Sequence, residues 1–227
     1  MKKTLVISLG GSLIIPKEMD FPFLNKFKKT LQSHYKKYKF VVVCGGGVIA
    51  RKYIAALKKQ KKSKRELSLA GIRATRMNAR FMMQFFGKEA NDTLPKSMKD
   101  IKTNLRKNAV VLCGALRYTK DSTSDSTAAK LAQYLRTEFI NMTNVKGLFS
   151  ANPKTNKKAK FIPKISWQDF KAKALKIKYK AGQSFVLDQS AAITIHKHKI
   201  STYILGSNTA LNSVLSKKPF TGTLIKN

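Results

Sequence analysis

Short apolar runs alternate along the chain with longer segments in which apolar residues recur every three or four positions. The runs are residues 4–9 (TLVISL), 40–43 (FVVV), 109–113 (AVVLC) and 139–143 (FINMT). Their length and β-branched content predict buried strands. The intervening segment 21–39 has an aromatic residue or leucine at every fourth position from Phe23, which predicts an amphipathic helix.

The C-terminal part of the chain continues the alternation. Helices are predicted for 166–175 and 188–199, and strands for 201–205 and 222–225. Ser166 stands at the N-cap position of its helix, and Asp188 starts the next one. The order of elements predicts an α/β protein with a mainly parallel central sheet. Because no repeat or Pro/Gly-rich linker divides the sequence, we expect residues 1–227 to form a single domain.

The charge balance adds a statement about partners. The chain carries 46 Lys and Arg against 11 Asp and Glu, a formal net charge of +35. Such a surface attracts polyanions, including nucleotides and RNA. The lysines are dispersed over predicted helix faces and loops with few aromatic residues between them. This pattern favours a solvated basic surface over a dedicated nucleic-acid groove.

No segment approaches the ~18 consecutive apolar residues that cross a bilayer. The apolar start of the chain is interrupted by Ser8 and Gly10 and lacks a cleavage pattern, so it is not interpreted as a signal peptide. A cytoplasmic location without a membrane partner is therefore expected. Cys44 and Cys113 each end an apolar run without zinc-site spacing, so we expect buried thiols and no metal site.

Small residues follow the predicted strands. They are Gly10, Gly11 and Ser12; Gly45, Gly46 and Gly47; Gly114; and Thr143 and Asn144. In an open parallel sheet, ligands bind beyond the carboxyl ends of the strands. A rim of bare backbone amides and small donors at that edge suits phosphate groups. Neither a P-loop nor a G-x-G-x-x-G fingerprint is present, which disfavours ordinary phosphate-loop kinases and Rossmann dehydrogenases.

The combination and order of motifs is more specific than any one of them. The motifs are ISLGGSLI, VVVCGGGVIARKYI, GIRATRMNAR, STSDSTAAKLA, MTNVKGLFSANPK, KAGQSFVLDQSAA and FTGTLI. In this order they resemble the amino acid kinase superfamily, and within it the uridylate kinases of archaeal type. The resemblance covers nearly the whole chain and is weakest at 87–108 and 115–122.

The resemblance implies a three-layer α/β/α sandwich that transfers the γ-phosphoryl group of ATP to UMP, giving UDP and ADP for pyrimidine nucleotide biosynthesis. Residues 1–137 would bind UMP and residues 138–227 would bind ATP, with Mg²⁺ carried by ATP. The resemblance also implies a homohexamer built from dimers.

Matched by motif, each site residue receives an expected role. The catalytic residues would be Asp125 and Arg51. The ATP site would contain Gly10, Gly11, Ser12, Gly47, Arg51, Thr143, Asn144, Phe149 and Asn152. The UMP site would contain Gly46, Ser68, Thr119, Ser122, Thr123 and Ser124. Asp125 would orient the cations or magnesium around the transferred phosphoryl group.

Phosphoryl transfer to UMP needs no general base, because the second pKa of a phosphate monoester is about 6 and the acceptor oxygen is already ionised near neutral pH. The protein must supply in-line positioning and neutralisation of charge on the equatorial oxygens. Backbone amides, helix N-termini and a cation such as Arg51 can do so.

The sequence also departs from the family pattern. Ser68, Lys146 and Asn152 stand where acidic residues are usual, and the Ser68 position would contact the UMP ribose. The loop 115–124 lacks the usual His-Pro-Gly type of turn. Ser8 stands where bacterial relatives have a catalytic lysine, and Lys180 is a possible substitute.

Alternatives therefore stay open at this stage. Gly45 to Gly47 could form a tight turn only, Arg51 could pair with a surface carboxylate, and Asp125 and Asp188 could be plain N-caps. For the whole protein, the alternatives to UMP kinase are a kinase of the same fold with another small acceptor, and a non-catalytic basic protein that binds RNA.

Overall fold

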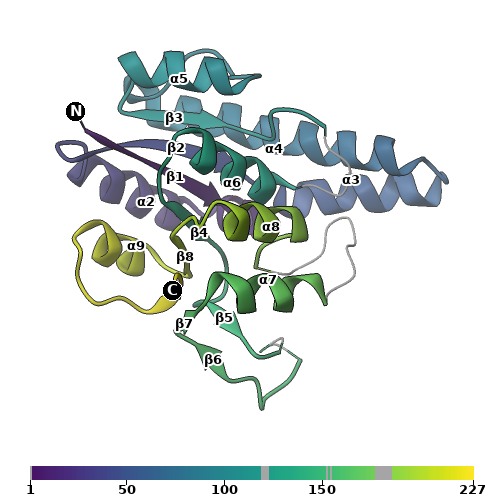
Figure 1. The fold of residues 1–227 in the computed structure, drawn as a ribbon. Coiled ribbons are helices and arrows are strands. Elements are labelled where there is room, and N and C mark those ends of the chain that lie inside the picture. The colour runs from purple at the N-terminus through teal and green to yellow at the C-terminus, as the bar shows by residue number, and fades with distance from the viewer. Residues whose placement is uncertain (1, 119–122, 152, 154, 177–185) are drawn as a thin grey trace.

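The central feature of the fold is one long sheet. The computed structural model describes residues 2–118, 123–151, 153, 155–176 and 186–227. Within these residues, seven strands form a sheet in the order β3-β2-β1-β4-β8-β9-β7 (Figure 1). The strands are β1 (Lys3–Leu9), β2 (Tyr38–Cys44), β3 (Val110–Cys113), β4 (Phe139–Met142), β7 (Lys164–Ile165), β8 (Thr202–Leu205) and β9 (Gly222–Ile225). A separate antiparallel pair joins β5 (Leu148–Phe149) to β6 (Phe161–Ile162).

The strands that matter for the site are parallel. β1 pairs in parallel with β2 and β4, β2 with β3, and β4 with β8. The exception lies at the far side, where β9 runs antiparallel to β8. The carboxyl ends of β1, β2, β3, β4 and β8 therefore lie at one edge, and the predicted mainly parallel sheet is confirmed.

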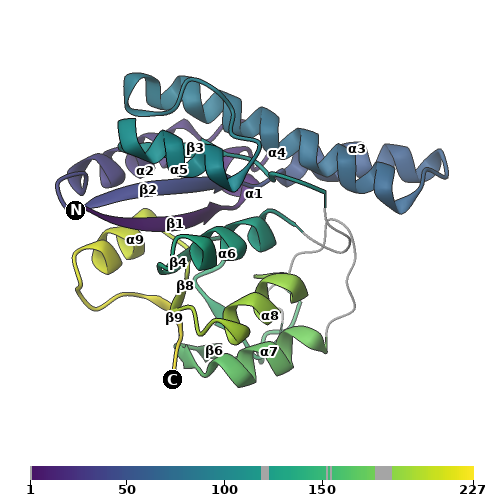
Figure 2. The same ribbon diagram turned by 45° about the horizontal axis from the view of Figure 1, so that its top comes forward.

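Helices cover both faces of the sheet, which makes the predicted three-layer sandwich correct (Figures 1 and 2). They are α1 (Gly11–Ile14), α2 (Phe21–Ser33), α3 (Gly47–Lys59), α4 (Lys64–Phe86), α5 (Met98–Lys107), α6 (Ser124–Tyr134), α7 (Trp167–Leu175), α8 (Gln189–Lys197) and α9 (Asn208–Leu215), with a short 3₁₀ turn at Gly87–Glu89. Alternate residues of β1 explain the two faces. Leu5 and Ile7 join the core with α2, α4 and α9, whereas Val6 joins the core with α5 to α8.

The helices α3 and α4 lie side by side and extend beyond the sheet as a long hairpin (Figures 1 and 2). α4 begins with a capping box in which the Ser63 hydroxyl accepts from the Glu66 amide and the Glu66 carboxylate accepts from the Ser63 amide. The lysine-rich segment 58–66 is thus mostly helical, with a short turn between the two helices.

One predicted boundary is wrong. The helix predicted for 21–39 ends at Ser33, and residues from Tyr38 onwards belong to β2. The four-residue spacing continues past Ser33. However, Tyr38 and Phe40 are buried in the core and belong to a strand that pairs with β1. Sheet pairing therefore overrides the helical period at this point.

Neither α5 nor α9 was predicted from the apolar pattern, and the four-residue α1 was not predicted either. α5 and α9 each begin at a serine whose hydroxyl accepts a backbone amide hydrogen bond, Ser97 for α5 and Ser207 for α9. Ser97 also forms a capping box with Asp100. The Ser-x-x-Asp pattern was the available signal for α5.

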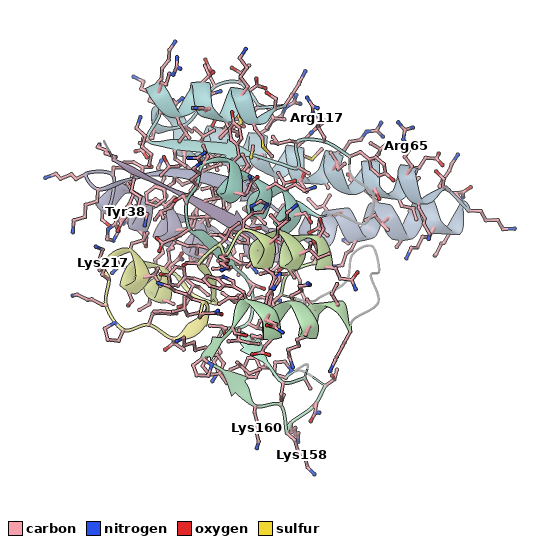
Figure 3. All side chains as sticks on the ribbon, in the orientation of Figure 1. Tyr38, Arg65, Arg117, Lys158, Lys160 and Lys217 are labelled. Carbon is pink, nitrogen blue, oxygen red and sulfur yellow. The ribbon has the colours of Figure 1, made fainter. Side chains whose placement is uncertain are left out.

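Basic side chains are spread over the whole surface. Arg65, Lys158 and Lys217 project from well-separated parts of the molecule (Figure 3). Cys44 and Cys113 are buried free thiols, as expected, and burial raises the pKa of both. Among the described helices, none is long and apolar enough to cross a membrane.

Candidate active site

Two glycine turns meet backbone to backbone at the carboxyl ends of β1 and β2. A Cβ atom added to Gly11 would lie 2.3 Å from the Gly47 nitrogen, and one added to Gly47 would lie 2.4 Å from the Gly11 carbonyl carbon. A Cβ on Gly45 would lie 2.6 Å from the Gly11 nitrogen. Gly47 also has φ of +56°. The glycines are therefore required by contact between the turns, before any ligand is considered.

The first turn of α3 leaves backbone donors at this edge. Its N-cap is Gly46, and no side chain caps it. The first amides of a helix have no intrahelical acceptor and carry partial positive charge, which suits a phosphate. Arg51 lies one turn into α3 with an exposed side chain. The ion pairs among the described residues are Lys3–Glu138 and Lys62–Glu66, so Arg51 has no carboxylate partner there.

The helix α4 contacts the glycine turn that follows β2, residues 45–47. The buried Asn78 side chain donates to the Gly45 carbonyl at 2.7 Å. A Cβ on Gly46 would lie 3.4 Å from the Gly71 carbonyl oxygen, so α4 also packs closely against this turn. Ser68 lies one turn before Gly71 on the same helix, and its hydroxyl donates to the Lys64 carbonyl at 3.0 Å. Sequence reasoning missed Asn78, whose only signal was a polar residue on an apolar helix face.

The segment that follows β3 is also hydrogen-bonded to α4. The Thr75 hydroxyl accepts from the Ala115 amide at 2.9 Å, and the Arg76 guanidinium donates to the carbonyls of Ala115 and Leu116 at 3.1 and 2.6 Å. These bonds fix the start of the loop that the sequence assigned to UMP. Thr119 and Ser122 of that loop lie outside the described residues.

Asp125 is linked to the central strand. Ser8 lies on β1, two residues before Gly10, and is fully buried. Its hydroxyl donates a hydrogen bond to the Asp125 carboxylate at 2.7 Å. Burial and, to a smaller extent, the nearby Asp188 charge raise the pKa of Asp125 to about 7, although the Ser8 hydrogen bond opposes the shift. The N-cap of α6 is Thr123, so the alternative that Asp125 is a plain N-cap is wrong.

Asp188 joins the starts of α6 and α8. It is the N-cap of α8 and accepts from the Ala191 amide at 2.7 Å, as the N-cap alternative expected. Its carboxylate also accepts from the hydroxyls of Thr123 and Ser126, both at 2.5 Å, and from their amides at 3.1 and 3.3 Å. These five hydrogen bonds hold the start of α6 against the start of α8. The Thr123 hydroxyl is thus already bonded to Asp188 within the protein.

The remaining predicted residues follow β4. The Thr143 amide donates to the Leu205 carbonyl at 2.9 Å, and Asn144 is exposed beside it. Phe149 packs against Phe161 with ring centroids 5.5 Å apart, and the Lys146 ammonium lies 5.8 and 5.1 Å from the two ring centroids. Asn152 and Lys180 lie outside the described residues.

The comparisons with known proteins agree with this geometry. A model of the amino acid kinase family matches residues 3–206. The chain belongs to the amino acid kinase family. The chain is 30% identical over 224 residues to a uridylate kinase from Thermococcus kodakarensis, covering 98% of this chain and 99% of the relative. It is 32% identical over 202 residues to a uridylate kinase from Archaeoglobus fulgidus, covering 88% and 90%.

Solved structures agree as well. The crystal structure of a uridylate kinase from Archaeoglobus fulgidus matches with a TM-score of 0.83 at 30% identity, over 99% of this chain and 100% of that one. The predicted membership of the amino acid kinase family and the predicted fold are therefore both confirmed.

Within this amino acid kinase fold, the predicted residues fall into three groups. Gly10 to Ser12 and Gly45 to Gly47 meet at neighbouring strand ends, and Thr143 directly follows the next strand, β4. Asp125 joins them through Ser8. Ser68 and Phe149 lie on separate elements, α4 and β5. No cluster of three His, Cys, Asp or Glu side chains that could hold a metal occurs in the described part of the chain.

The contact between the turns predicts a large stability difference between two glycine substitutions. Gly11→Ala should lower the free energy of unfolding by about 3 kcal/mol or more, because backbone atoms must move apart. Gly71→Ala is the matched control. Its Cβ would lie 3.6 Å from the side chain of Ile54 on the neighbouring α3, an ordinary van der Waals contact. Because Gly71 is inside α4, the substitution should be neutral or stabilise the protein by about 0.5–1 kcal/mol. Denaturant unfolding measures both, and equal midpoints for the two variants would contradict the assigned contact.

The environment of Asp125 predicts a pH-dependent stability. Because its pKa is raised from 3.8 to about 7, the unfolded carboxyl ionises at a lower pH than the folded one. Its contribution to the free energy of unfolding is complete below pH about 4, decreases as pH rises, and is lost above pH about 7. Asp125→Asn should remove this component. Denaturant titrations of both proteins across that range measure it, and parallel pH profiles would rule it out.

Proposed function

We propose that this chain is a uridylate kinase, which transfers the γ-phosphoryl group of ATP to UMP and releases UDP and ADP. The observation that carries the proposal is the start of α3, which has no side-chain cap and has Arg51 one turn further on. It lies where the two glycine turns contact each other. Ser8, on the strand before the first of these turns, donates a hydrogen bond to Asp125. The uridylate kinases named above, which match almost the full chain, support it.

In this proposal, residues 1–137 hold UMP and residues 138–227 hold ATP. Gly10, Gly11, Ser12, Gly47, Arg51, Thr143, Asn144, Phe149 and Asn152 contact ATP. Gly46, Ser68, Thr119, Ser122, Thr123 and Ser124 contact UMP. The reaction belongs to pyrimidine nucleotide biosynthesis and takes place in the cytoplasm.

The protein contributes positioning and charge neutralisation. The acceptor phosphate needs no base, since the second pKa of a monoester is about 6. Backbone amides of the glycine turns and the Arg51 guanidinium neutralise the charge on the transferred group. MgATP is the substrate, and its magnesium would offset charge on the β- and γ-phosphates.

Asp125 fits a role toward that cation. No cluster of three acidic or imidazole ligands is available among the described residues, so most ligands of a magnesium ion would be phosphates and water, as is usual for this ion. Asp125 would be the protein carboxylate that holds it. Because the pKa of Asp125 is about 7 without ligands, an approaching cation would favour its ionised form.

A second acceptor is the alternative that one observation favours. The Ser68 hydroxyl donates to the Lys64 carbonyl and is neutral, so it can only accept a hydrogen bond from a ribose, with about half the strength of a carboxylate. Weaker binding of the ribose would lower the selectivity for UMP, so that another small phosphate or carboxylate acceptor could be used on the same fold.

Turnover with a panel of acceptors tests the proposal. We expect ADP release from MgATP with UMP and little with CMP, dTMP, AMP or GMP. Arg51→Ala and Asp125→Asn should each lower kcat by about 10²-fold or more, because each removes charge stabilisation from the transition state. Lys52→Ala is the matched control on the same helix and should stay within about twofold.

The outcomes separate the alternatives. Selective turnover with another acceptor would replace UMP while keeping the kinase assignment. Full activity of both Arg51→Ala and Asp125→Asn would refute the site assignment. ATP binding without turnover on any acceptor would indicate a binding protein built on a kinase fold.

We further propose that the protein assembles as a homohexamer built from dimers. Six subunits of formal charge +35 repel one another, so assembly should need bound anions or moderate salt. Sedimentation velocity should show smaller species at about 10 mM ionic strength and hexamers at about 150 mM or with ATP. A stable hexamer at low ionic strength without nucleotide would contradict the expectation.

A further inference from the structure

A cavity lies at the opposite edge of the sheet from the glycine turns. Its volume is about 470 Å³, and it is lined by Lys3 at the start of β1, by residues 136–138 before β4 and by residues 198–201 before β8. These are the amino ends of parallel strands. The cavity is therefore separate from the candidate active site at their carboxyl ends.

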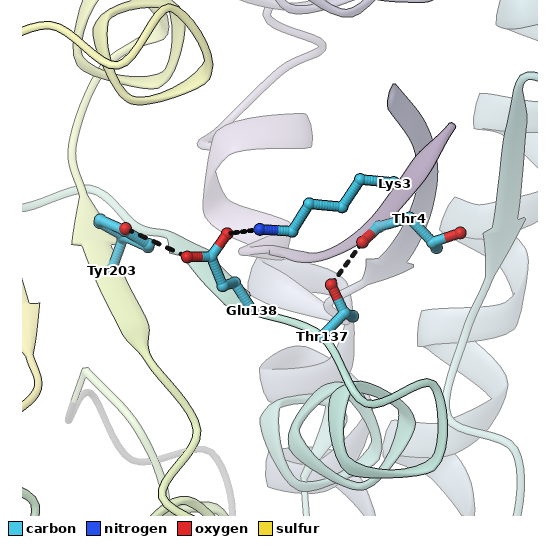
Figure 4. A network of polar contacts seen from close by, with 5 residues as sticks. All are labelled: Lys3, Thr4, Thr137, Glu138 and Tyr203. Atoms are coloured by element: carbon cyan, nitrogen blue, oxygen red, sulfur yellow. Dashed lines mark hydrogen bonds and ion pairs between the residues drawn. The ribbon is translucent and has the colours of Figure 1, made fainter. Parts of the chain in front are cut away.

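The cavity has more positive than negative charge. Lys3, Arg136 and Lys199 line it together with Glu138. The Lys3 ammonium is 2.6 Å from the Glu138 carboxylate, which also accepts from the Tyr203 hydroxyl at 3.5 Å (Figure 4). Lys3 and Glu138 thus neutralise each other. Arg136 and Lys199 are exposed and have no ion-pair partner among the described residues, so two cations remain uncompensated.

These two cations are carried by hydrogen-bonded turns at the ends of two helices. Arg136 follows α6 and has φ of 51°, and Lys199 follows α8 and has φ of 48°. Glycine is the usual residue in this left-handed conformation after a helix. The backbone amide of the next residue closes each turn. The Thr137 amide donates to the Ala132 carbonyl at 2.9 Å, and the Ile200 amide donates to the Ile195 carbonyl at 3.0 Å.

We propose that this cavity binds a small oligophosphate, a molecule with at least two phosphate groups and up to the size of a nucleoside triphosphate. Two cations on separate turns suit an anion whose charges are spread over several groups. Their charge also offsets the partial negative charge at the carboxyl ends of α6 and α8. Ser201 and Gln133 add polar side chains to the lining, and the volume lies within the range of small-molecule sites.

The chain contains its own reporter for this site. Trp167 is the single tryptophan, and its indole donates to the carbonyl of Ile200, a residue that lines the cavity, at 2.9 Å. A ligand that contacts the turn at 198–201 should therefore change tryptophan fluorescence. Inorganic tripolyphosphate is the probe, because it carries the phosphates without a base or ribose.

The test compares two double variants of the full chain at about 150 mM salt, where general electrostatic attraction is largely screened. Arg136→Gly with Lys199→Gly removes the two uncompensated cations and places glycine where φ is positive. Lys61→Gly with Lys217→Gly is the matched control, since these residues have φ of 52° and 57° and do not line the cavity. Both pairs lower the net charge by two. Neither belongs to the candidate active site.

We expect saturable quenching or enhancement of Trp167 emission in the wild type. The cavity pair should weaken tripolyphosphate binding about tenfold or more, because two charge-assisted contacts are lost, and the control pair should stay within about twofold. No saturable change in the wild type, or equal weakening by both pairs, would overturn the proposal. Arg136→Asn with Lys199→Asn tests the same charges if the glycine pair unfolds, because asparagine also tolerates this conformation. None of these outcomes depends on turnover with UMP.

Discussion

The contact between the glycine turns after β1 and β2 is the constraint on which the site depends. Backbone atoms of Gly11 and Gly47 approach so closely that neither residue can carry a Cβ atom. This contact brings the starts of α1 and α3 together at one edge of the sheet. Because side chains are absent, the groups that remain there are backbone amides, which bind phosphate without a titratable group. A packing requirement inside the protein therefore also creates the surface that a phosphoryl-transfer site needs.

The few acidic residues are used in a similar way. Ten of the eleven lie in the described part of the chain, and nine of these accept a hydrogen bond from another residue. The nine are Asp20, Glu66, Glu89, Asp92, Asp100, Asp125, Glu138, Asp169 and Asp188. Four of the nine, Asp20, Glu66, Asp100 and Asp188, accept from backbone amides at helix starts, where a carboxylate satisfies amides that would otherwise lack a partner. The few acidic residues thus support the starts of α2, α4, α5 and α8, whereas α1 and α3 have no side-chain cap.

The sequence predicted β1 to β4, β8, β9 and the edge of the site because apolar runs and the residues that follow them are local signals, whereas the two-residue strands β5, β6 and β7 are too short to give such a signal. Strand ends at Gly10 and Gly45 needed no three-dimensional information. The approach of Gly11 to Gly47 could not be predicted, because it depends on the register between β1 and β2 and on the path of both turns. The supporting role of Asn78 was equally hidden, since a polar residue on a helix does not reveal its acceptor.

The two aspartates near the site show how environment separates residues that look alike in sequence. Asp188 stabilises the starts of α6 and α8 through five hydrogen bonds, so its negative charge is compensated by donors within the protein. Among the described residues, the Asp125 carboxylate accepts one hydrogen bond, from Ser8, and burial raises its pKa to about 7. Near neutral pH this carboxyl is therefore only partly ionised. The difference between the two carboxylates is thus set by the donors around them, which their positions in the sequence do not reveal.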